Sequence, residues 1–185
     1  MNSEMMLRSA PQWLAHWAAI SPDRPALVIE NEGTIRYGEW AIAVARMAKW
    51  LRGAGVQAGM LVGIESANQY LHAVAMLGAE TVGAYTVSFS STDIADGDSA
   101  MQRCDWLLHE TTPNPIAAAG RRVQINQAFI DTLAAIALTS DDLGALQKSS
   151  GPNTIVRVQR SSGTTGEKKI IGLHPVYIKL ACQIQ

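Results

Sequence analysis

The stretch MLVGIESANQYLHAVAMLGAETVGAYTVSF, residues 60–89, decides the fold class of this chain. Residues 60–66 form a short apolar run that predicts a buried strand, and residues 83–89 form a second run of this kind. Between them, residues 68–80 have the length and composition of a helix, and Asn68 stands where a capping residue belongs. A strand, a crossover helix and a second strand together predict a parallel unit.

The flanking sequence extends this alternation in both directions. Further helices are predicted at residues 9–20, 38–53, 97–104 and 126–138, and further strands at residues 105–110 and 154–159. The runs ALVIE and TIRY, on either side of the turn NEG at residues 31–33, predict a hairpin. Because the strands are nearly continuous apolar runs, we expect an α/β fold, a mostly parallel sheet with helices on both faces.

Composition and charge exclude several classes of partner. The 185 residues are 48% hydrophobic and 17% charged, which is typical of a globular chain rather than a disordered one. The formal net charge is −1 and the basic residues do not cluster, so we expect no nucleic-acid partner. Polar residues and glycines interrupt the apolar segments before they reach membrane-spanning length, so we expect no membrane insertion.

The cysteines, the histidines and the N-terminus bear on the compartment. Cys104 and Cys182 are far apart in the sequence, which is typical of free thiols in a reducing cytoplasm. The chain shows no basic leader followed by a long apolar segment, so no signal peptide is predicted. The four histidines lack the His-Glu-x-x-His spacing of a zinc site. We therefore expect a cytoplasmic protein without zinc.

A second stretch, RVQRSSGTTGEKKIIGLHP at residues 157–175, carries the chemistry. Small and hydroxylated residues fill successive positions and two cations follow: Ser161, Ser162, Gly163, Thr164, Thr165, Gly166, Lys168 and Lys169. Glycine lets a ligand approach the main chain, and successive amides in such a turn favour anions. Hydroxyl donors and ammonium groups complete the requirements of a polyphosphate site.

Two common phosphate-binding patterns do not fit this stretch. Gly163 and Gly166 are too close for the P-loop of nucleoside triphosphatases, and no lysine follows either glycine directly. The Gly-x-Gly-x-x-Gly fingerprint of dinucleotide-binding folds is absent. Composition alone favours a flexible surface loop. A position between two strands of an α/β sheet favours a ligand site, and both interpretations stay open on these grounds.

The segment RSSGTTGEKKI, residues 160–170, resembles the phosphate-binding loop of the adenylate-forming superfamily, which includes acyl-CoA synthetases and the adenylation domains of peptide synthetases. The pattern of that family is Ser-Gly-Thr-Thr-Gly, any residue, Pro, Lys, and residues 162–166 match it without a gap. Lys168 stands where proline is usual, and Lys169 stands at the family lysine. His174 resembles the family histidine that follows. Its spacing fits from Lys168 and is one residue short from Lys169, so the lysine that holds phosphate stays open.

The resemblance continues upstream in the family order. SPDRPALV at residues 21–28 and TIRYGEW at residues 34–40 are similar to early family phrases. Residues 51–85 are similar to a family segment that ends in an Ala-rich helix and Gly-Ala. The chain is thus identified as a member of this superfamily, corresponding to an incomplete N-terminal subdomain. Residues 1–185 are the N-terminal part of an AMP-binding domain, residues 160–169 are its phosphate-binding loop, and the rest of the large domain and the C-terminal domain are absent.

The resemblance implies a reaction and its cofactors. In such enzymes a carboxylic acid and ATP, with Mg²⁺, form an acyl adenylate, and a thiol of coenzyme A or of a carrier pantetheine takes the acyl group. The implied nucleotide-binding residues are Ser161, Ser162, Gly163, Thr164, Thr165, Gly166, Lys168, Lys169 and His174. No catalytic residue is assigned, because the segments that supply adenine, ribose and magnesium contacts in the family would lie beyond residue 185. We therefore expect the 185 residues to be catalytically incomplete.

Other interpretations stay open beside this one. The chain fits a non-catalytic interaction module that dimerises or complements a partner carrying the missing C-terminal portion. A small open-sheet nucleotide or flavin binder is a further alternative, although it lacks the full fingerprint. A fragment of a complete enzyme is the plainest explanation of the length. The sequence does not name the acid, nor does it decide between coenzyme A and a carrier protein.

Overall fold

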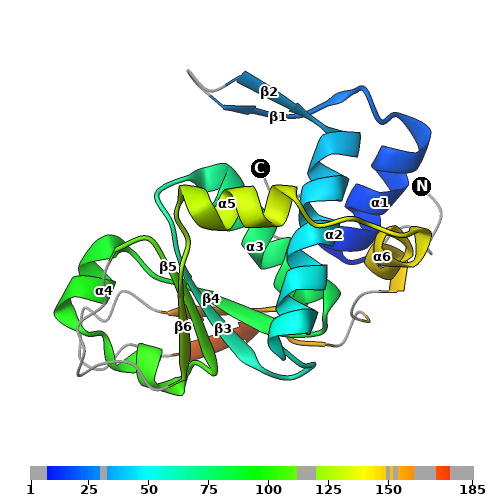
Figure 1. Cartoon of the computed structure of the whole chain (residues 1–185). Helices are drawn as coiled ribbons and strands as arrows, with labels where there is room; N and C mark the ends of the chain where they lie inside the picture. Colours follow the sequence, from blue (N-terminus) through cyan, green and yellow to red (C-terminus); the bar gives the residue numbers. More distant parts are fainter. Residues whose placement is uncertain are drawn as a thin grey trace.

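The computed structural model describes residues 8–29, 33–111, 120–148, 151, 154–160 and 170–175. These residues form a two-stranded hairpin and a six-stranded sheet with helices packed against it (Figure 1). The strands are β1 (Pro25–Ile29), β2 (Gly33–Arg36), β3 (Leu61–Glu65), β4 (Tyr85–Ser88), β5 (Trp106–His109), β6 (Arg121–Gln124), β7 (Arg157–Arg160) and β8 (Ile170–Leu173). The helices are α1 (Ala10–Ile20), α2 (Tyr37–Ala54), α3 (Gln69–Thr81), α4 (Ser91–Asp96), α5 (Gln127–Ala134) and α6 (Ser140–Gly144), and short 3₁₀ helices are Ser99–Arg103 and Ala145–Lys148.

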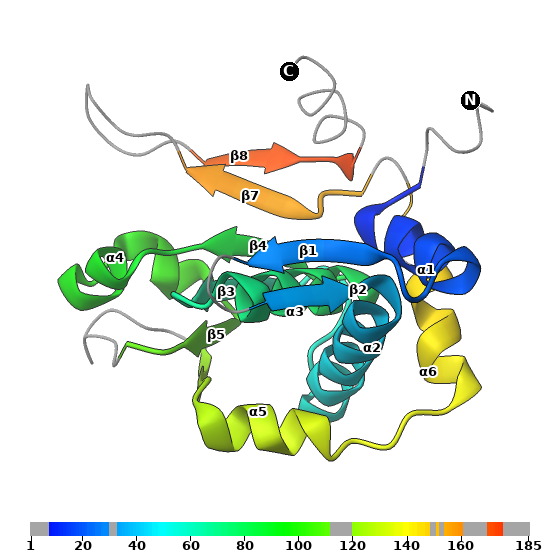
Figure 2. The ribbon, with the colours of Figure 1, turned by 90° about the horizontal axis from the view of Figure 1, so that it is seen from above.

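The large sheet is mostly parallel, as the sequence predicts. Its strand order is β6-β5-β3-β4-β7-β8, and the pairing is parallel except between β7 and β8. The predicted unit of residues 60–89 is confirmed as β3, α3 and β4, and Asn68 Oδ1 accepts a hydrogen bond from the Leu71 amide as the predicted cap. Figure 2 shows β7 and β8 at one edge of this sheet.

Helices cover the two faces unequally. On one face α1, α2, α3 and α5 pack into a large apolar core that includes Met47, Leu51, Ile64 and Leu108. On the other face α4 and the 3₁₀ helix Ser99–Arg103 cover a smaller cluster, which contains Phe89, Ile94, Met101 and Cys104. The expectation of helices on both faces is therefore confirmed.

The hairpin of β1 and β2 and the first two helices also match the predictions. The strands pair antiparallel, with Ile29 opposite Gly33. Helix α1 begins after Ser9, whose amide donates to Gln12 Oε1 at 2.8 Å. Helix α2 ends at Gly55, which adopts the left-handed conformation with φ 99° that glycine tolerates.

Several elements differ from the sequence-based expectation. Strand β6 was not predicted, because the edge strand RRVQ carries two arginines and only Val123 as an apolar residue. The predicted helix at 97–104 is a 3₁₀ helix, and α4 precedes it behind a Ser90–Asp93 capping box. Helix α5 ends at Ala134, not at residue 138. Beyond it the carbonyls of Ile136 and Ala137 accept hydrogen bonds from Arg46 and Lys49 of α2, which holds this segment out of the helix. Helix α6 was also not predicted.

Within the described ranges, no helix combines the length and the apolar character that crossing a membrane requires.

Candidate functional site

The predicted loop leaves the carboxyl edge of the parallel sheet. Strands β4 and β7 are parallel, so Ser88 and Arg160 lie at the same edge. Arg160 pairs with Ile170, which brings the two ends of the loop side by side. The loop residues themselves lie outside the described residues: Ser161, Ser162, Gly163, Thr164, Thr165, Gly166, Lys168 and Lys169. In open α/β sheets this edge is where ligands bind.

Arg160, the last described residue before the loop, is held by contacts with four residues. Its Nη1 donates to Asp98 Oδ2 at 2.5 Å, and its Nη2 donates to Asp93 Oδ2 at 2.8 Å and to the Ser88 carbonyl at 3.2 Å. The guanidinium also lies over the Phe89 ring, 4.6 Å from its centroid. Because two carboxylates neutralise this cation, Arg160 anchors the start of the loop rather than presenting a free positive charge there.

A different part of the carboxyl edge is closed by the chain's own carboxylates. The connections diverge between β3 and β5, which is where such sheets form a binding crevice. Buried Glu65 accepts hydrogen bonds there from the amides of Glu110 and Thr111 at 2.9 and 2.8 Å. In return, Glu110 accepts from Ser66 Oγ at 2.7 Å and from the Ala67 amide at 2.8 Å. These amides are already paired, so the crevice offers them to no ligand anion.

His72 of α3 lies beside this edge of the sheet. Its Nε2 lies 2.9 Å from Ser88 Oγ at the end of β4. Burial lowers the pKa of His72, which favours the neutral ring at neutral pH. The sequence carries no signal for Arg160, Ser88 and His72 as a group, because they come from three separate elements.

His174 lies at the opposite end of the β7–β8 hairpin from the loop. Its neighbour Leu173 pairs with Arg157, the first residue of β7. The structure therefore does not bring His174 together with the ends of the predicted loop.

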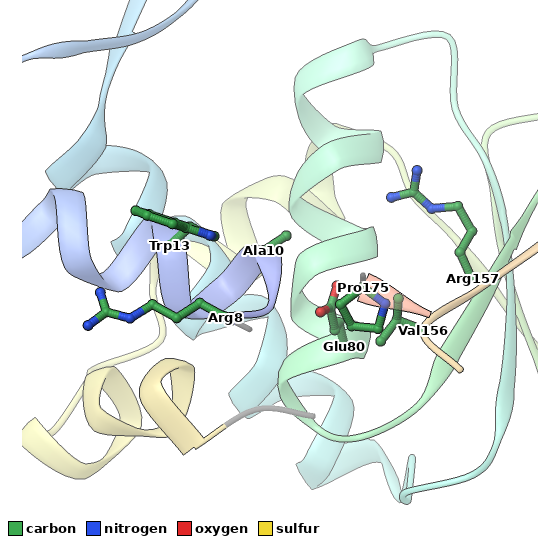
Figure 3. A pocket seen from close by; sticks show the side chains of 7 residues that line it. All are labelled: Arg8, Ala10, Trp13, Glu80, Val156, Arg157 and Pro175. Atoms are coloured by element: carbon green, nitrogen blue, oxygen red, sulfur yellow. The ribbon is translucent and has the colours of Figure 1, made fainter. Parts of the chain in front are cut away.

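Pro175, the next residue, lines a pocket of about 150 Å³ with Arg8, Ala10, Trp13, Glu80, Val156 and Arg157 (Figure 3). Burial raises the pKa of Glu80 to about 7, although nearby Arg157 and a backbone hydrogen bond oppose that shift. The pocket thus holds a carboxyl group whose charge depends on pH near neutrality.

A larger hollow adjoins this pocket. We call the larger hollow the aromatic groove. It has a volume of about 430 Å³, and its lining residues are Ala10, Trp13, Leu14, Trp17, Tyr37, Trp40, Ala73, Met76, Leu77 and Arg157. The smaller pocket shares Ala10, Trp13 and Arg157 with it. Apolar and aromatic side chains of α1, α2 and α3 make up nearly all of its wall.

In the part of the chain that the structure describes, no three side chains of His, Cys, Asp or Glu gather into a possible metal site. No ligand is therefore assigned for the Mg²⁺ that the resemblance implies.

The architecture, a mostly parallel sheet that ends in an antiparallel hairpin, is that of the N-terminal subdomain of adenylate-forming enzymes. The family model described as AMP-binding enzyme matches residues 14–174, and the chain belongs to this family. A search of curated proteins found no match.

Solved structures support the fold. The N-terminal subdomain of NpsA from Klebsiella oxytoca is similar with a TM-score of 0.70 and 18% identity, over 91% of this chain and 42% of that one. A double mutant of o-succinylbenzoate CoA synthetase (MenE) from Bacillus subtilis, bound to a product analogue, gives a TM-score of 0.73 and 19% identity over 95% and 36%. VinN in complex with L-aspartate gives 0.68 and 18% over 96% and 52%. The chain thus spans about half or less of these three relatives.

Proposed function

We propose that this chain forms the ATP-phosphate-binding wall of an ATP-dependent ligase that joins a carboxylic acid to a thiol. The observation that carries the proposal is the position of residues 161–169, between β7 and β8 at the carboxyl edge, in a chain of the AMP-binding enzyme family. The titles of the structural relatives are consistent with it, since one is a CoA synthetase and another was solved with an amino acid.

The loop would act electrostatically. In the first step a carboxylate oxygen of the acid attacks the α-phosphorus of ATP, the bond to the bridging oxygen breaks, and pyrophosphate leaves. The hydroxyls of Ser162, Thr164 and Thr165 and the amides near Gly163 and Gly166 would stabilise the negative charge on that leaving group. Lys168 or Lys169 would supply the positive charge, because Arg160 is already paired with carboxylates.

In the second step a thiol sulfur of coenzyme A or of pantetheine attacks the acyl carbonyl, and AMP leaves. None of the described residues discriminates between these two thiols. We assign no phosphate contact to His174, because the β7–β8 register separates it from the ends of the loop. We expect these 185 residues to release no pyrophosphate from ATP on their own, since they supply one wall of the site.

The test is a titration of the ¹⁵N-labelled chain with pyrophosphate and, separately, with ATP and Mg²⁺. We expect the amide signals of Gly163 and Gly166 to shift with millimolar ligand, and spectra that stay identical would refute phosphate binding by the loop. The variants Lys168→Ala and Lys169→Ala decide which lysine binds, because the change that weakens the shift identifies it. Lys148→Ala, at an exposed position at the end of the 3₁₀ helix Ala145–Lys148, is the matched control and should leave the titration unchanged.

A further inference from the structure

We propose that a cavity on the sheet face with the smaller core binds a small carboxylic acid in its ionised form, with the carboxylate on Arg103 and the apolar body against the strands. The cavity has a volume of about 220 Å³, and it lies on the opposite face of the sheet from the aromatic groove. We call it the carboxylate cavity. This inference does not depend on phosphate binding by the loop.

Side chains of three adjacent strands form the floor of the carboxylate cavity. Leu61 of β3 pairs with Tyr85 of β4, and Val87 of β4 pairs with Val158 of β7. Because Tyr85 and Val87 are two positions apart on one strand, all four side chains project from the same face of the sheet. Leu61, Val87 and Val158 belong to the smaller core, so the floor is an apolar surface held in place by packing.

The 3₁₀ helix Ser99–Arg103 supplies a wall of the cavity through Ala100 and Arg103. These two residues are three positions apart, a spacing that places side chains one above the other in a 3₁₀ helix. Ala100 is half-buried and short, so it leaves space above the strands, whereas Arg103 is exposed. The wall therefore combines a small apolar side chain with a cation.

Two hydrogen-bond donors at the cavity are unused. In the part of the chain that the structure describes, neither the Arg103 guanidinium nor the Tyr85 hydroxyl has a hydrogen-bond or ion-pair partner. A guanidinium binds a carboxylate through two parallel N–H groups, and a phenol donates one further hydrogen bond. These donors beside an apolar floor favour a ligand with one anionic group and an apolar body.

The carboxylates of the chain nearest to this cavity bind other groups. Arg160, which lines the cavity at the carboxyl edge, forms ion pairs with Asp93 and Asp98. Asp105 Oδ2 accepts a hydrogen bond from the Leu61 amide at 2.8 Å. Within the described ranges no carboxylate is thus placed on Arg103, and the carboxylate of a bound acid would be its partner.

The volume of the cavity limits the size of the ligand. About 220 Å³ corresponds to the share of liquid volume of about seven water molecules. An acid with a single ring or a short chain fits this space, whereas a nucleotide does not. Burial of its apolar part against the strands would stabilise the complex. Benzoate meets these requirements and is the probe for the test.

The test is an NMR titration of the full, methyl-labelled chain with benzoate. The methyl signals of Val87 and Val158 report on the floor of the cavity, and we expect them to shift and to saturate at millimolar benzoate. Benzamide has nearly the same shape without the charge, so it should bind about tenfold more weakly or worse. Methyl signals that do not shift, or benzamide that binds as tightly as benzoate, would overturn the proposal.

Two substitutions test the charge and the space separately. Arg103→Gln removes the cation at an exposed position and should weaken benzoate binding by about tenfold or more. Ala100→Leu fills the space above the strands and should abolish binding. Arg52→Gln, at an exposed position of α2 on the other side of the sheet, is the matched control and should bind benzoate as the natural chain does. Equal affinity in Arg103→Gln and Arg52→Gln would overturn the proposal.

A competition experiment separates the carboxylate cavity from the predicted phosphate-binding loop. The benzoate titration is repeated in the presence of excess pyrophosphate. We expect the affinity for benzoate to stay unchanged, because the anion in the cavity binds Arg103 and not the loop. Displacement of benzoate by pyrophosphate would show that the two anions share one site, and would overturn the proposal. Failure of pyrophosphate to bind the loop would count against the proposed function alone.

Discussion

At the scale of the residue, burial sets the chemistry of individual side chains. Glu80 is 5% exposed at the end of α3 and lines the small pocket with Arg157 and Pro175. Desolvation is the main reason that its pKa is raised to about 7 from an ordinary value of 4.5. Nothing in the segment GAETVGA distinguishes this carboxyl group from a solvated one, because its burial depends on α1 and β7.

The raised pKa of Glu80 predicts a pH-dependent stability. The folded state binds the proton more tightly than the unfolded state, so the stabilisation is complete below pH 4.5 and is lost as the pH rises through 7. The full loss is on the order of 3 kcal/mol. Urea unfolding at pH 5 and pH 8 should show this loss in the natural chain and a much smaller one in Glu80→Gln.

Asp96→Asn, at an exposed position of α4, is the control for this experiment and should keep the pH dependence of the natural chain. A Glu80→Gln variant whose stability still falls as steeply between the two pH values would contradict the assignment of the effect to Glu80.

At the scale of the element, the close crossing of α2 and α3 depends on one glycine. A Cβ atom at Gly78 would lie 2.5 Å from Met47 Cγ and 2.9 Å from Met47 Cβ. Met47 is itself fully buried, so the neighbouring helix has little room to yield. Gly78 therefore allows α3 to pack closely against α2, and this packing matters more for stability than the low helix propensity of glycine.

A pair of alanine substitutions separates these two effects. Gly78→Ala should destabilise the fold by about 1–3 kcal/mol, because overpacking outweighs the gain in helix propensity. Gly53→Ala, in α2 with no atom within 4 Å of the added Cβ, should instead stabilise it by about 0.5–1 kcal/mol. The measurement is the free energy of unfolding in urea. Equal effects at the two positions would show that the crossing tolerates a methyl group.

The anchoring of the loop is also a property of elements in combination. Arg160 links the end of β7 to the end of β4 and to α4. Its guanidinium forms ion pairs with two aspartates. At the neighbouring crevice, Glu65 and Glu110 pair with the amides of each other's loops. We therefore expect a ligand to bind on the β4–β7 side of the carboxyl edge.

At the scale of the whole molecule, packing decreases from the centre of the sheet to the β8 edge. All five residues of β3 are buried, and β3 lies between β5 and β4. Among the described strands, β8 pairs with β7 alone, and Ile171 on it is 52% exposed. The predicted phosphate-binding loop therefore joins the less buried strands of the sheet.

This gradient predicts a gradient of hydrogen exchange. Amides of β3 and β5 should exchange at rates set by global unfolding, because their opening exposes the core. Amides of β8 that pair with β7 should exchange faster, through local opening of the edge. Native-state exchange followed by NMR measures both groups in one sample. Protection in β8 as high as that in β3 would mean that the edge opens only with the whole fold.

The sequence alone determined several of the local elements and the family. Apolar runs, helical spacing and caps such as Asn68 depend on residues a few positions apart, and for that reason β3, α3, β4 and the β1–β2 hairpin could be predicted. The order of family motifs led to the AMP-binding enzyme family, which the match over residues 14–174 confirms.

Tertiary structure alone decided the surroundings of the candidate site. The Arg160 anchor joins residues 62 and 67 positions apart, and the Glu65–Thr111 contacts join residues 46 apart. The β7–β8 register separates His174 from the loop, and the packing of α1 beside β7 buries Glu80. No short-range pattern encodes these distances, because each arises when strands and helices distant in the sequence pack around a shared core.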